Sequence, residues 1–382
     1  MAKKKKVRVD LRKNRTRPPR QRGWTRQFQE HGPEVEDSPL QERVRAKGDL
    51  SRRRTIIQEE GGAAAGAEPA EMPAVAEGEC LPGRVLRVHG LWSVVRAEDG
   101  RRFRCAVRRL LKSLATDERN IVTTGDRVWF RPALNDEGLI ERVEPRHGLL
   151  TRATRGREHV LVANVDQFVI VVSLVEPGLK PHLIDRFLAS AEQGGISPIL
   201  CLNKADLVDP ARYQPTIGLY SQLGIPTLLT SAATGQGIDR LRSLLKGRET
   251  VFAGQSGVGK SSLLNRVEPG LGLRVREVST ATQKGRHTTT TAELIELGFG
   301  GWVVDTPGIR QFQLWDIIPE EVEGFFPEFR PLVPLCAFPD CTHTHEERCA
   351  VKRAVRLRLV SASRYTSYLG MFSGAGEEGW VD

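Results

Sequence analysis

The sequence predicts a multidomain chain of mixed α/β and β class, with a small β-barrel, a parallel α/β sheet and a mostly helical C-terminal region in that order. Three observations support this prediction. Short alternating apolar runs separated by turn residues begin at Gly83, and apolar runs alternate with longer helical patterns from about residue 160. Three of the six cysteines gather between positions 336 and 349. The 382 residues suffice for two or three domains with separate cores.

Charge and hydropathy exclude the membrane and secreted classes and locate the basic residues. The chain has 57 Lys and Arg against 47 Asp and Glu, a net charge of +10, and the first thirty residues account for this surplus with 12 basic and 2 acidic residues. The longest apolar stretch, residues 168–175, is too short to cross a bilayer, and the basic run at residues 3–6 leads into no apolar segment. We therefore expect a cytoplasmic, monomeric protein with no membrane partner.

Residues 1–78 are predicted to be a disordered basic extension. They begin with the basic run and end in a stretch rich in Gly, Ala, Pro and Glu, which offers little apolar surface to offset the entropy of ordering. Two interpretations stay open. The extension is either a solubilising arm or an electrostatic tether to nucleic acid, because clustered Lys and Arg release condensed counterions from a polyanion.

Residues 79–152 are predicted to form a barrel of the oligonucleotide-binding (OB) type. Five short apolar runs indicate strands at 85–88, 92–95, 102–107, 127–130 and 139–143. Residues 84–152 contain 15 basic and 9 acidic side chains. Five arginines gather on one hairpin and its exit: Arg101, Arg102, Arg104, Arg108 and Arg109. This pattern favours an RNA-facing surface over a merely solvated barrel face.

Residues 153–316 are predicted to form a parallel α/β domain. Strands are expected at 168–174, 198–202, 227–230, 250–253, 294–297 and 302–304, and helices at 183–193, 238–246 and 260–267. Each helix lies between two strands, so right-handed crossovers are possible. Ligands of such sheets bind at the carboxyl ends of the strands.

A phosphate-binding loop follows the expected strand at 250–253. It matches the pattern G-x-x-x-x-G-K-[ST] in the required position between a strand and a helix. Its residues, with the serine that follows, are Gly254, Gln255, Ser256, Gly257, Val258, Gly259, Lys260, Ser261 and Ser262. The glycines allow backbone N–H groups to surround a phosphate, Lys260 would reach the outer phosphates, and the Ser261 hydroxyl would hold magnesium.

Three further motifs at strand ends indicate a guanine nucleotide. Asp305 opens a D-x-x-G turn that ends at Gly308, which is where a magnesium-linked carboxylate belongs in P-loop enzymes. Asn203, Lys204 and Asp206 end another strand, and the Asp206 carboxylate can accept hydrogen bonds from the guanine N1–H and N2–H₂ groups, which adenine lacks as a pair. Ser231 and Ala232 end a third strand and can present backbone donors to the guanine carbonyl.

The order of these motifs indicates a circularly permuted, Ras-like P-loop GTPase. In ordinary small GTPases the phosphate loop precedes the guanine-binding motif, whereas here Asn203 and Ser231 precede Gly254. The contacts need spatial position rather than chain order, so the same sheet can be assembled from the rearranged chain.

The residue that orients the attacking water is not evident from the motifs. Many GTPases place a glutamine directly after the D-x-x-G turn, but here the residue is Ile309, which has no polar group. His287, in a Thr-rich segment, is the nearest polar candidate because a neutral imidazole can orient water. Any of the threonines at 288–291 could complete magnesium coordination, and spacing does not choose among them.

Residues 317–382 are predicted to be a zinc-binding domain with a basic helical tail. Cys336, Cys341, His343 and Cys349 supply the three thiols and one imidazole of a closed structural zinc site. Two alternatives stay open: His345 could replace His343, and the thiols could be redox-active or catalytic instead. A basic helical segment is expected from about residue 346 to 369.

These motifs resemble those of the ribosome small-subunit-dependent GTPase A family (RsgA, also called YjeQ) over about residues 80–365. The matching segments are residues 255–265, residues 285–290 and Cys341-Thr342-His343. The resemblance implies a factor that acts late in small ribosomal subunit maturation, with GTP hydrolysis stimulated by the subunit. It also implies that Thr289 is the magnesium-linked threonine and that His287 is catalytic. The long N-terminal extension and the sequence Glu346-Glu347-Arg348 depart from the family pattern.

The resulting expectation is a GTP hydrolase that binds the small subunit and its rRNA, cycles between GTP and GDP, and uses Lys260, His287 and Thr289 in catalysis. It would carry one structural zinc ion, and magnesium with GTP. Ile309 motivates one alternative, a GTP-gated rRNA-binding scaffold with incidental hydrolysis. A metabolic P-loop kinase is a weaker alternative. Such an enzyme would bind ATP, and adenine lacks the pair of donors that the Asp206 carboxylate can accept from.

Overall fold

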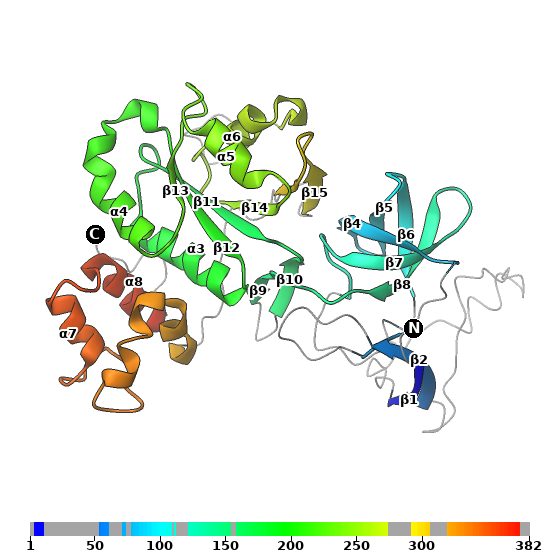
Figure 1. The fold of residues 1–382 in the computed structure, drawn as a ribbon, viewed down its shortest axis with the longest axis horizontal. Coiled ribbons are helices and arrows are strands. Elements are labelled where there is room, and N and C mark those ends of the chain that lie inside the picture. The colour runs from blue at the N-terminus through cyan, green and yellow to red at the C-terminus, as the bar shows by residue number, and fades with distance from the viewer. Residues whose placement is uncertain are drawn as a thin grey trace, which may run out of the picture.

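The computed structural model describes residues 4–10, 53–60, 71–73, 78–108, 111, 121–153, 158–273, 292–305 and 319–374. The β-barrel lies on one side of the central α/β sheet, and the C-terminal helices lie on the other side, against a long helix of the α/β layer (Figure 1). No described helix has the length and apolar character that crossing a membrane requires.

Three strands near the N-terminus differ from the predicted disorder of residues 1–78. Strands β1 (Lys4–Asp10), β2 (Arg53–Glu60) and β3 (Glu71–Pro73) form an antiparallel sheet. Their register places Lys4 opposite Glu59 and Val7 opposite Ile56. Partners so distant in the chain leave no local pattern, which is why composition alone predicted no strands here. The rest of the extension lies outside the described residues.

The predicted barrel is present, with all five strands. They are β4 (Leu81–His89), β5 (Trp92–Ala97), β6 (Arg102–Val107), β7 (Arg127–Pro132) and β8 (Glu137–Val143). Their order is β4-β5-β6-β8-β7, and a further β4–β7 pairing closes the barrel. Alternation sends Phe103 and Cys105 inward and Arg102 and Arg104 outward on β6, so the apolar residues fill the interior. A two-stranded hairpin, β9 (Leu150–Ala153) and β10 (Glu158–Val162), follows the barrel.

The central sheet contains the six strands predicted from the apolar runs. They are β11 (Gln167–Ser173), β12 (Ser197–Asn203), β13 (Thr227–Leu229), β14 (Glu249–Ala253), β15 (Glu293–Glu296) and β16 (Trp302–Asp305). The spatial order is β13-β12-β11-β14-β16-β15, with only β15 antiparallel to its neighbour within this sheet. The strand before the phosphate loop therefore lies in the middle of the sheet, next to β11, although it comes fourth in the chain.

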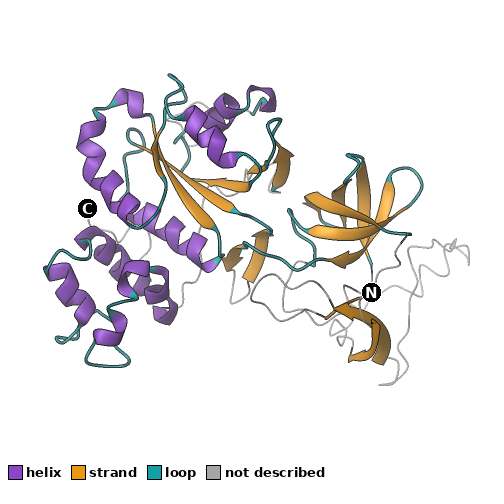
Figure 2. Ribbon diagram, in the orientation of Figure 1, coloured by secondary structure: helices purple, strands orange, loops and turns teal. Residues whose placement is uncertain are grey.

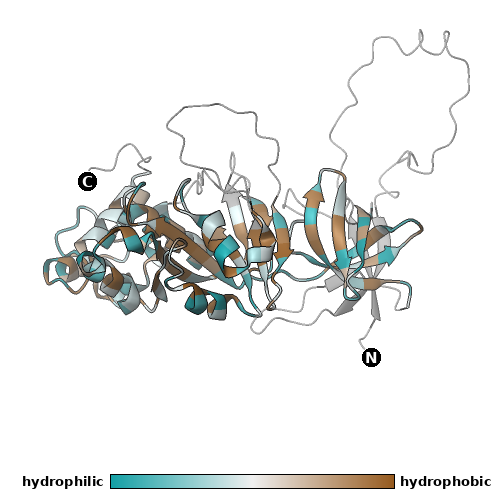
Figure 3. Ribbon diagram, turned by 90° about the horizontal axis from the view of Figure 1, so that it is seen from above, coloured by the Kyte–Doolittle hydropathy of each residue, from teal (hydrophilic) through white to brown (hydrophobic). Residues whose placement is uncertain are grey.

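Helices cover both faces of this sheet (Figure 2). They are α3 (Pro181–Gln193), α4 (Gln214–Gln222), α5 (Ile238–Leu245) and α6 (Lys260–Val267). Phe168 and Ile170 pack in the core with α3 and α4, whereas Val169 and Val171 pack with α5 and α6. The strands are accordingly hydrophobic on both sides (Figure 3). Helix α4 was not predicted, because Pro215 and Gly218 lower its helix propensity.

The C-terminal region begins with three short 3₁₀ turns, Pro319–Phe325, Pro327–Phe329 and Val333–Leu335. Two helices follow, α7 (Ala350–Arg356) and α8 (Ala362–Phe372). The predicted basic helical segment is thus divided, and Arg358 in the break has a left-handed φ of 59°. Aromatic side chains, among them Phe326, Phe329 and Tyr368, form the core of this region.

Polar contacts attach the barrel to the central sheet. Strand β4 pairs with β15 at Arg87 and Glu293. Arg84 forms an ion pair with Glu249 at the start of β14, and the Arg87 guanidinium lies 3.5 Å from the Glu293 carboxylate. We call this junction the barrel seam.

A buried arginine connects the C-terminal region to helix α3. Arg364 on α8 is only 2% exposed, and its guanidinium donates to Asp185 at 2.9 Å and to Glu328 at 2.7 and 3.0 Å. The Tyr220 hydroxyl also donates to Asp185, and the guanidinium lies over the Phe326 ring. Burial disfavours the charge, but Asp185 and Glu328 raise the pKa of Arg364 above its ordinary value. The contact therefore holds α3 and α8 together, although the second carboxylate oxygen of Asp185, Oδ2, is buried without a hydrogen-bond partner among the described residues.

Replacing Arg364 with methionine should lower the free energy of unfolding by about 3–5 kcal/mol, because it leaves the Asp185 charge buried without its partner. Urea unfolding followed by circular dichroism measures this change. Arg330, which pairs with Glu192 of α3 at the surface, is the matched control. Arg330→Ala should cost less than about 1 kcal/mol. Equal losses of unfolding free energy in the two variants would contradict the claim that burial makes the Arg364 cluster more stabilising than a surface ion pair.

Candidate functional site

The turn between β14 and α6 has the backbone conformation that a phosphate loop needs. Gly254, Gly257 and Gly259 have positive φ angles of 143°, 82° and 95°. A Cβ atom at Gly254 would lie 2.0 Å from the carbonyl oxygen of Val171, so glycine is required there. The loop leads directly into the N-terminus of α6, where free backbone N–H groups favour a bound anion.

The ammonium group of Lys260 lies over this loop. Its Nζ atom donates to the carbonyl oxygens of Gly254 at 2.6 Å and Gln255 at 2.7 Å. The positive charge therefore sits at the mouth of the loop, within reach of anionic oxygens bound to the loop amides. Ser261 follows on the first turn of α6, as the motif requires.

Asn203 joins the guanine-binding motif to the phosphate loop. Its side-chain amide is buried, and Nδ2 donates to the carbonyl oxygen of Val258 at 2.8 Å. The hydroxyl of Thr230, at the end of β13, donates to Asn203 Oδ1 at 3.3 Å. A Cβ at Gly259 would lie 2.4 Å from Asn203 Nδ2, so Gly259 must lack a side chain for this amide to fit. Three strand ends are thereby connected through one side chain.

The neighbouring motif residues follow the ends of β12 and β13. Lys204 adopts a left-handed φ of 62°, and its Nζ donates to the carbonyl oxygen of Glu176 at 2.6 Å. Asp206 is exposed in the short turn that follows. Ser231 is buried, and its hydroxyl accepts from the N–H of Thr234 at 3.1 Å. Ala232 comes next and is half-buried.

Asp305 ends β16, and Val304 pairs with Val251 of β14, so the strand end lies next to the phosphate loop. Three predicted site residues, Gly308, His287 and Thr289, lie outside the described residues, and their roles stay predictions. Of the predicted site, the structure therefore brings together the phosphate loop, the guanine motif and the strand end that carries Asp305.

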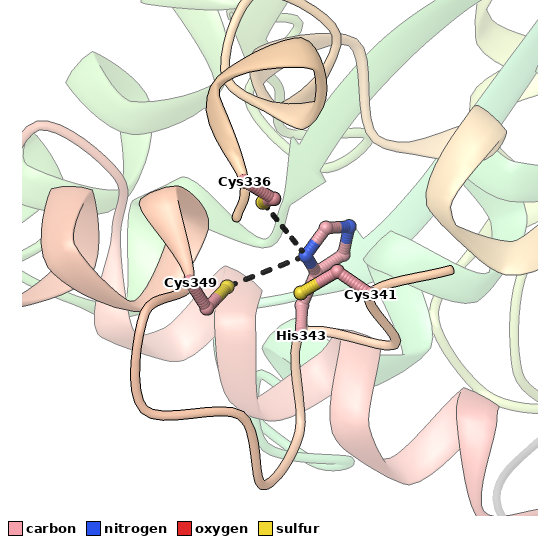
Figure 4. A group of neighbouring side chains, drawn as sticks. All are labelled: Cys336, Cys341, His343 and Cys349. Atoms are coloured by element: carbon pink, nitrogen blue, oxygen red, sulfur yellow. Dashed lines mark hydrogen bonds between the residues drawn. The ribbon is translucent and has the colours of Figure 1, made fainter. Parts of the chain in front are cut away.

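The four predicted metal ligands converge in the C-terminal region. Their ligand atoms all lie within 4.8 Å of one another, and Figure 4 shows the side chains pointing toward a common centre. His343 Nδ1 lies 3.6 Å from Cys336 Sγ and 3.3 Å from Cys349 Sγ. Cys341 completes the set. Three thiols and an imidazole at this spacing fit a tetrahedral metal ion.

A carboxylate orients the histidine of this cluster. The other ring nitrogen of His343, Nε2, lies 2.9 Å from the Glu323 carboxylate, and the Tyr365 hydroxyl donates to the His343 carbonyl at 2.7 Å. Such an outer carboxylate fixes the tautomer and leaves Nδ1 free to face a metal. His345 is 82% exposed and lies outside the cluster. Geometry thus favours His343 over His345.

Glu346, the first residue of the run Glu346-Glu347-Arg348, braces the metal loop. Its carboxylate accepts from the Thr342 N–H at 2.7 Å, the Thr342 hydroxyl at 2.7 Å and the Thr344 N–H at 3.0 Å. Burial by itself would raise the pKa of Glu346, but these hydrogen bonds lower it to about 2. The metal loop is therefore well supported by this carboxylate.

The other cysteines are buried separately. Cys105 lies in the barrel core and Cys201 in the central sheet. Burial raises the pKa of each thiol to about 12, which keeps it protonated and unreactive.

The outer face of the barrel combines arginines with aromatic rings. Arg104 lies over the Trp92 ring at 4.8 Å, and His89 stacks on that ring at 4.3 Å. Arg101 and Arg108 form ion pairs with Asp99 and Glu141. Arg102 is exposed on β6, and Arg109 lies outside the described residues. This face thus has the composition of a single-strand binding surface.

Motif reasoning missed the residues that support the site from a distance. Glu176 acts through its backbone carbonyl, which accepts from Lys204, and therefore carries no side-chain signature. Glu323 precedes His343 by twenty positions. No spacing rule connects the two, because they meet only when the first 3₁₀ turn packs against the metal loop.

Comparisons with known proteins agree with this geometry. The sequence model of the RsgA GTPase family matches residues 143–315. The small ribosomal subunit biogenesis GTPase RsgA of Bacteroides fragilis is 39% identical over 305 residues, which cover 78% of this chain and 98% of that protein. The RsgA of Moorella thermoacetica is 44% identical over 289 residues, covering 76% of this chain and 95% of that protein.

Two solved structures have the same fold. The crystal structure of YjeQ from Thermotoga maritima superposes with a TM-score of 0.64 at 38% identity, covering 79% of this chain and all of that one. YloQ, described as a circularly permuted GTPase, has a TM-score of 0.60 at 28% identity and covers 81% of this chain and all of its own. The predicted permutation is thereby confirmed.

Asn203→Ala should weaken the binding of GDP and of inosine diphosphate (IDP) by the same factor, about tenfold. The reason is that the lost hydrogen bond holds the phosphate loop and does not contact the base. Fluorescence titration with labelled nucleotides measures both affinities. Asp206→Asn is the matched comparison. It should reduce the preference for GDP over IDP, since the IDP base lacks the 2-amino group that a carboxylate accepts from. A changed GDP/IDP ratio in Asn203→Ala would show that Asn203 contacts the base.

Proposed function

The chain belongs to the RsgA GTPase family, and we propose that it hydrolyses GTP to GDP and phosphate on the small ribosomal subunit, late in the maturation of that subunit. One observation carries the proposal. Motifs from four strands, scattered between residues 203 and 305, lie at one edge of a single sheet that is attached to a basic barrel. The relatives are named small ribosomal subunit biogenesis GTPases, which supports the small subunit as the partner.

The chain divides, in this proposal, into four functional regions. Residues 1–78 form a basic extension that tethers the protein to RNA, and residues 79–152 form the RNA-binding barrel. Residues 153–316 form the permuted GTPase domain, and residues 317–382 form the zinc domain. We propose that the protein acts as a monomer in the cytoplasm.

Nucleotide recognition follows from the described contacts. The amides of residues 254–262 and the Lys260 ammonium bind the phosphates. Asp206 accepts from the guanine N1–H and N2–H₂ groups, and the backbone at Ser231 and Ala232 faces the guanine carbonyl. Asn203 holds the loop in the conformation that these contacts need.

Magnesium fits the oxygen-bearing residues at this edge. The Ser261 hydroxyl follows Lys260 directly, and Asp305 ends the adjacent parallel strand. Ser261 and Thr289 would hold the ion, which neutralises charge on the phosphate oxygens when it is bound. His287 orients the attacking water in place of the missing glutamine.

Zinc is the metal that best suits the C-terminal cluster. Three thiolates and one imidazole are soft and borderline ligands, and four protein ligands leave no position for a substrate. The ion therefore has a structural role. It ties Cys336, after the third 3₁₀ turn, to Cys349 at the start of α7.

A switch requires that the GTP and GDP forms differ in their affinity for the subunit. We propose that the GTP form binds tightly and that hydrolysis lowers affinity and releases the protein. The barrel and the zinc domain supply the RNA contacts, and their positions on opposite sides of the GTPase domain allow two separate RNA segments to be engaged (Figure 1).

GTP turnover should rise strongly when small subunits are added, and much less with large subunits or free RNA. Phosphate release under multiple-turnover conditions measures this. Binding of small subunits with no stimulation would instead support a GTP-gated scaffold. Equal affinity of the GTP-analogue and GDP forms would contradict the release step while leaving the GTPase assignment intact.

His287→Ala should lower subunit-stimulated turnover by about 100-fold, the usual scale for losing one group that positions or accepts a proton. GTP affinity should stay unchanged, because the imidazole acts on water. His345→Ala, which removes an exposed imidazole far from the nucleotide, is the control and should turn over normally. Near-normal stimulated turnover in a folded His287→Ala protein would eliminate His287 from catalysis.

Purified protein should contain one zinc ion per chain by elemental analysis, and Glu323→Gln should weaken zinc binding by about 10–100-fold, because an amide orients the His343 ring less strongly. Competition with a chromophoric chelator measures the affinity. Glu321→Gln, an exposed residue in the same 3₁₀ turn, should retain full affinity. Equal affinities in the two variants would remove Glu323 from the metal site.

A further inference from the structure

A cavity of about 370 Å³ opens at the barrel seam. Its walls come from strands β4, β5 and β7 of the barrel and from the first residue of β16 in the central sheet. Two tryptophans, Trp129 and Trp302, and three arginines, Arg84, Arg96 and Arg127, line it. Its volume falls in the range of small-molecule sites, which often occur between domains.

Each of the two indoles lies beneath an arginine. Arg142 lies over the Trp129 ring at 5.5 Å, and Arg96 lies over the Trp302 ring at 5.2 Å. Arg96 is in turn anchored by an ion pair with Glu296 at 3.0 Å. The rings come from two domains, and each is only partly buried. Partly exposed indoles are the side chains on which unpaired bases stack.

Arginines and carboxylates both line the cavity, where Glu98 and Glu144 accompany the three arginines. Arg84 and Arg127 share Glu249, and Arg127 is 54% exposed with its nearest oxygen at 3.5 Å. Among the described residues, the Nε atom of Arg84 is buried and has no hydrogen-bond partner. Burial and the neighbouring Arg127 charge lower the pKa of Arg84 to about 10. An added anion would relieve this repulsion.

The cavity is separate from the GTP site. Glu249 and Trp302 begin their strands, whereas the phosphate loop and Asp305 follow or end the same strands. The cavity therefore lies toward the amino edge of the parallel sheet, and the nucleotide motifs lie at the carboxyl edge. Substitutions in the cavity should leave GTP binding intact.

We propose that this cavity binds a single unpaired nucleotide of RNA, with its base against Trp129 and Trp302 and its phosphate at Arg127. The proposal rests on the proposed function, because it assigns part of the RNA contact to a defined site. Bringing together a ring from the barrel and a ring from the GTPase domain, the bound nucleotide would also strengthen the barrel seam.

Fluorescence anisotropy with a labelled single-stranded RNA dodecamer of mixed sequence tests the site in the full-length protein. Trp129→Leu should weaken binding about tenfold through lost stacking. Arg127→Gln should weaken it and reduce the slope of log affinity against log salt by about 0.7, as expected for one lost phosphate contact. Phe299→Leu is the matched control, since Phe299 is a half-buried aromatic residue beneath an arginine, Arg242, but lies outside both the cavity and the barrel.

Crosslinking with 4-thiouridine RNA gives an independent measurement that needs no variant. Mass spectrometry should find crosslinked peptides that contain Trp129 or Trp302. Wild-type affinity in Arg127→Gln, an equal loss in Phe299→Leu, or crosslinks confined to other peptides would overturn the proposal. Displacement of the RNA by micromolar AMP or UMP would show that the ligand is a free nucleotide, which also overturns it.

These failures differ from failure of the proposed function. Subunit-stimulated GTP turnover in the wild-type protein can succeed while the cavity variants bind RNA normally, and then only the cavity assignment is wrong. Absence of stimulation in the wild type would instead remove the subunit-dependent activity, whatever the cavity binds.

Discussion

The position of β14 between β11 and β16 is the constraint on which the GTPase domain depends. This pairing puts the phosphate loop at the centre of the carboxyl edge, where Asn203 from β12 can reach it and Asp305 from β16 lies beside it. Chain order does not affect these contacts. Parallel strands pair through backbone hydrogen bonds, which depend on where the strands lie in space and not on their order in the chain. A permuted chain therefore builds the same site, and Gly259 keeps the space that the Asn203 amide needs.

The two outer domains are attached to this sheet by different kinds of interaction. The C-terminal region is held to α3 through the buried Arg364 cluster and an aromatic core, so it packs as part of the GTPase body. The barrel is held at the seam by one short strand pairing, the largely buried Arg84–Glu249 pair and two more exposed ion pairs, which solvent screens more effectively. Adjustment to a bound RNA would thus be less costly at the seam than at α3.

Local patterns predicted most of the fold because each domain has a strong one. Alternation identified the barrel strands, and continuous apolar runs identified the buried strands of the central sheet. Prediction failed where stability comes from distant partners. Helix α4 contains Pro215 and Gly218 yet forms because Tyr220 is buried against Asp185. Strands β1 and β2 pair across more than forty residues that no local pattern connects.

The sequence by itself determined the residue types on which the predicted chemistry depends: a phosphate-loop pattern, a carboxylate in the guanine motif, and three thiols with an imidazole. These features depend on residue type and on short spacings along the chain, which can be read directly from the sequence. Only the tertiary structure decided which histidine faces the metal cluster, that Asn203 supports the phosphate loop, and that Trp129 and Trp302 share one cavity. Those facts depend on contacts between residues distant in the chain, and packing alone brings such residues together.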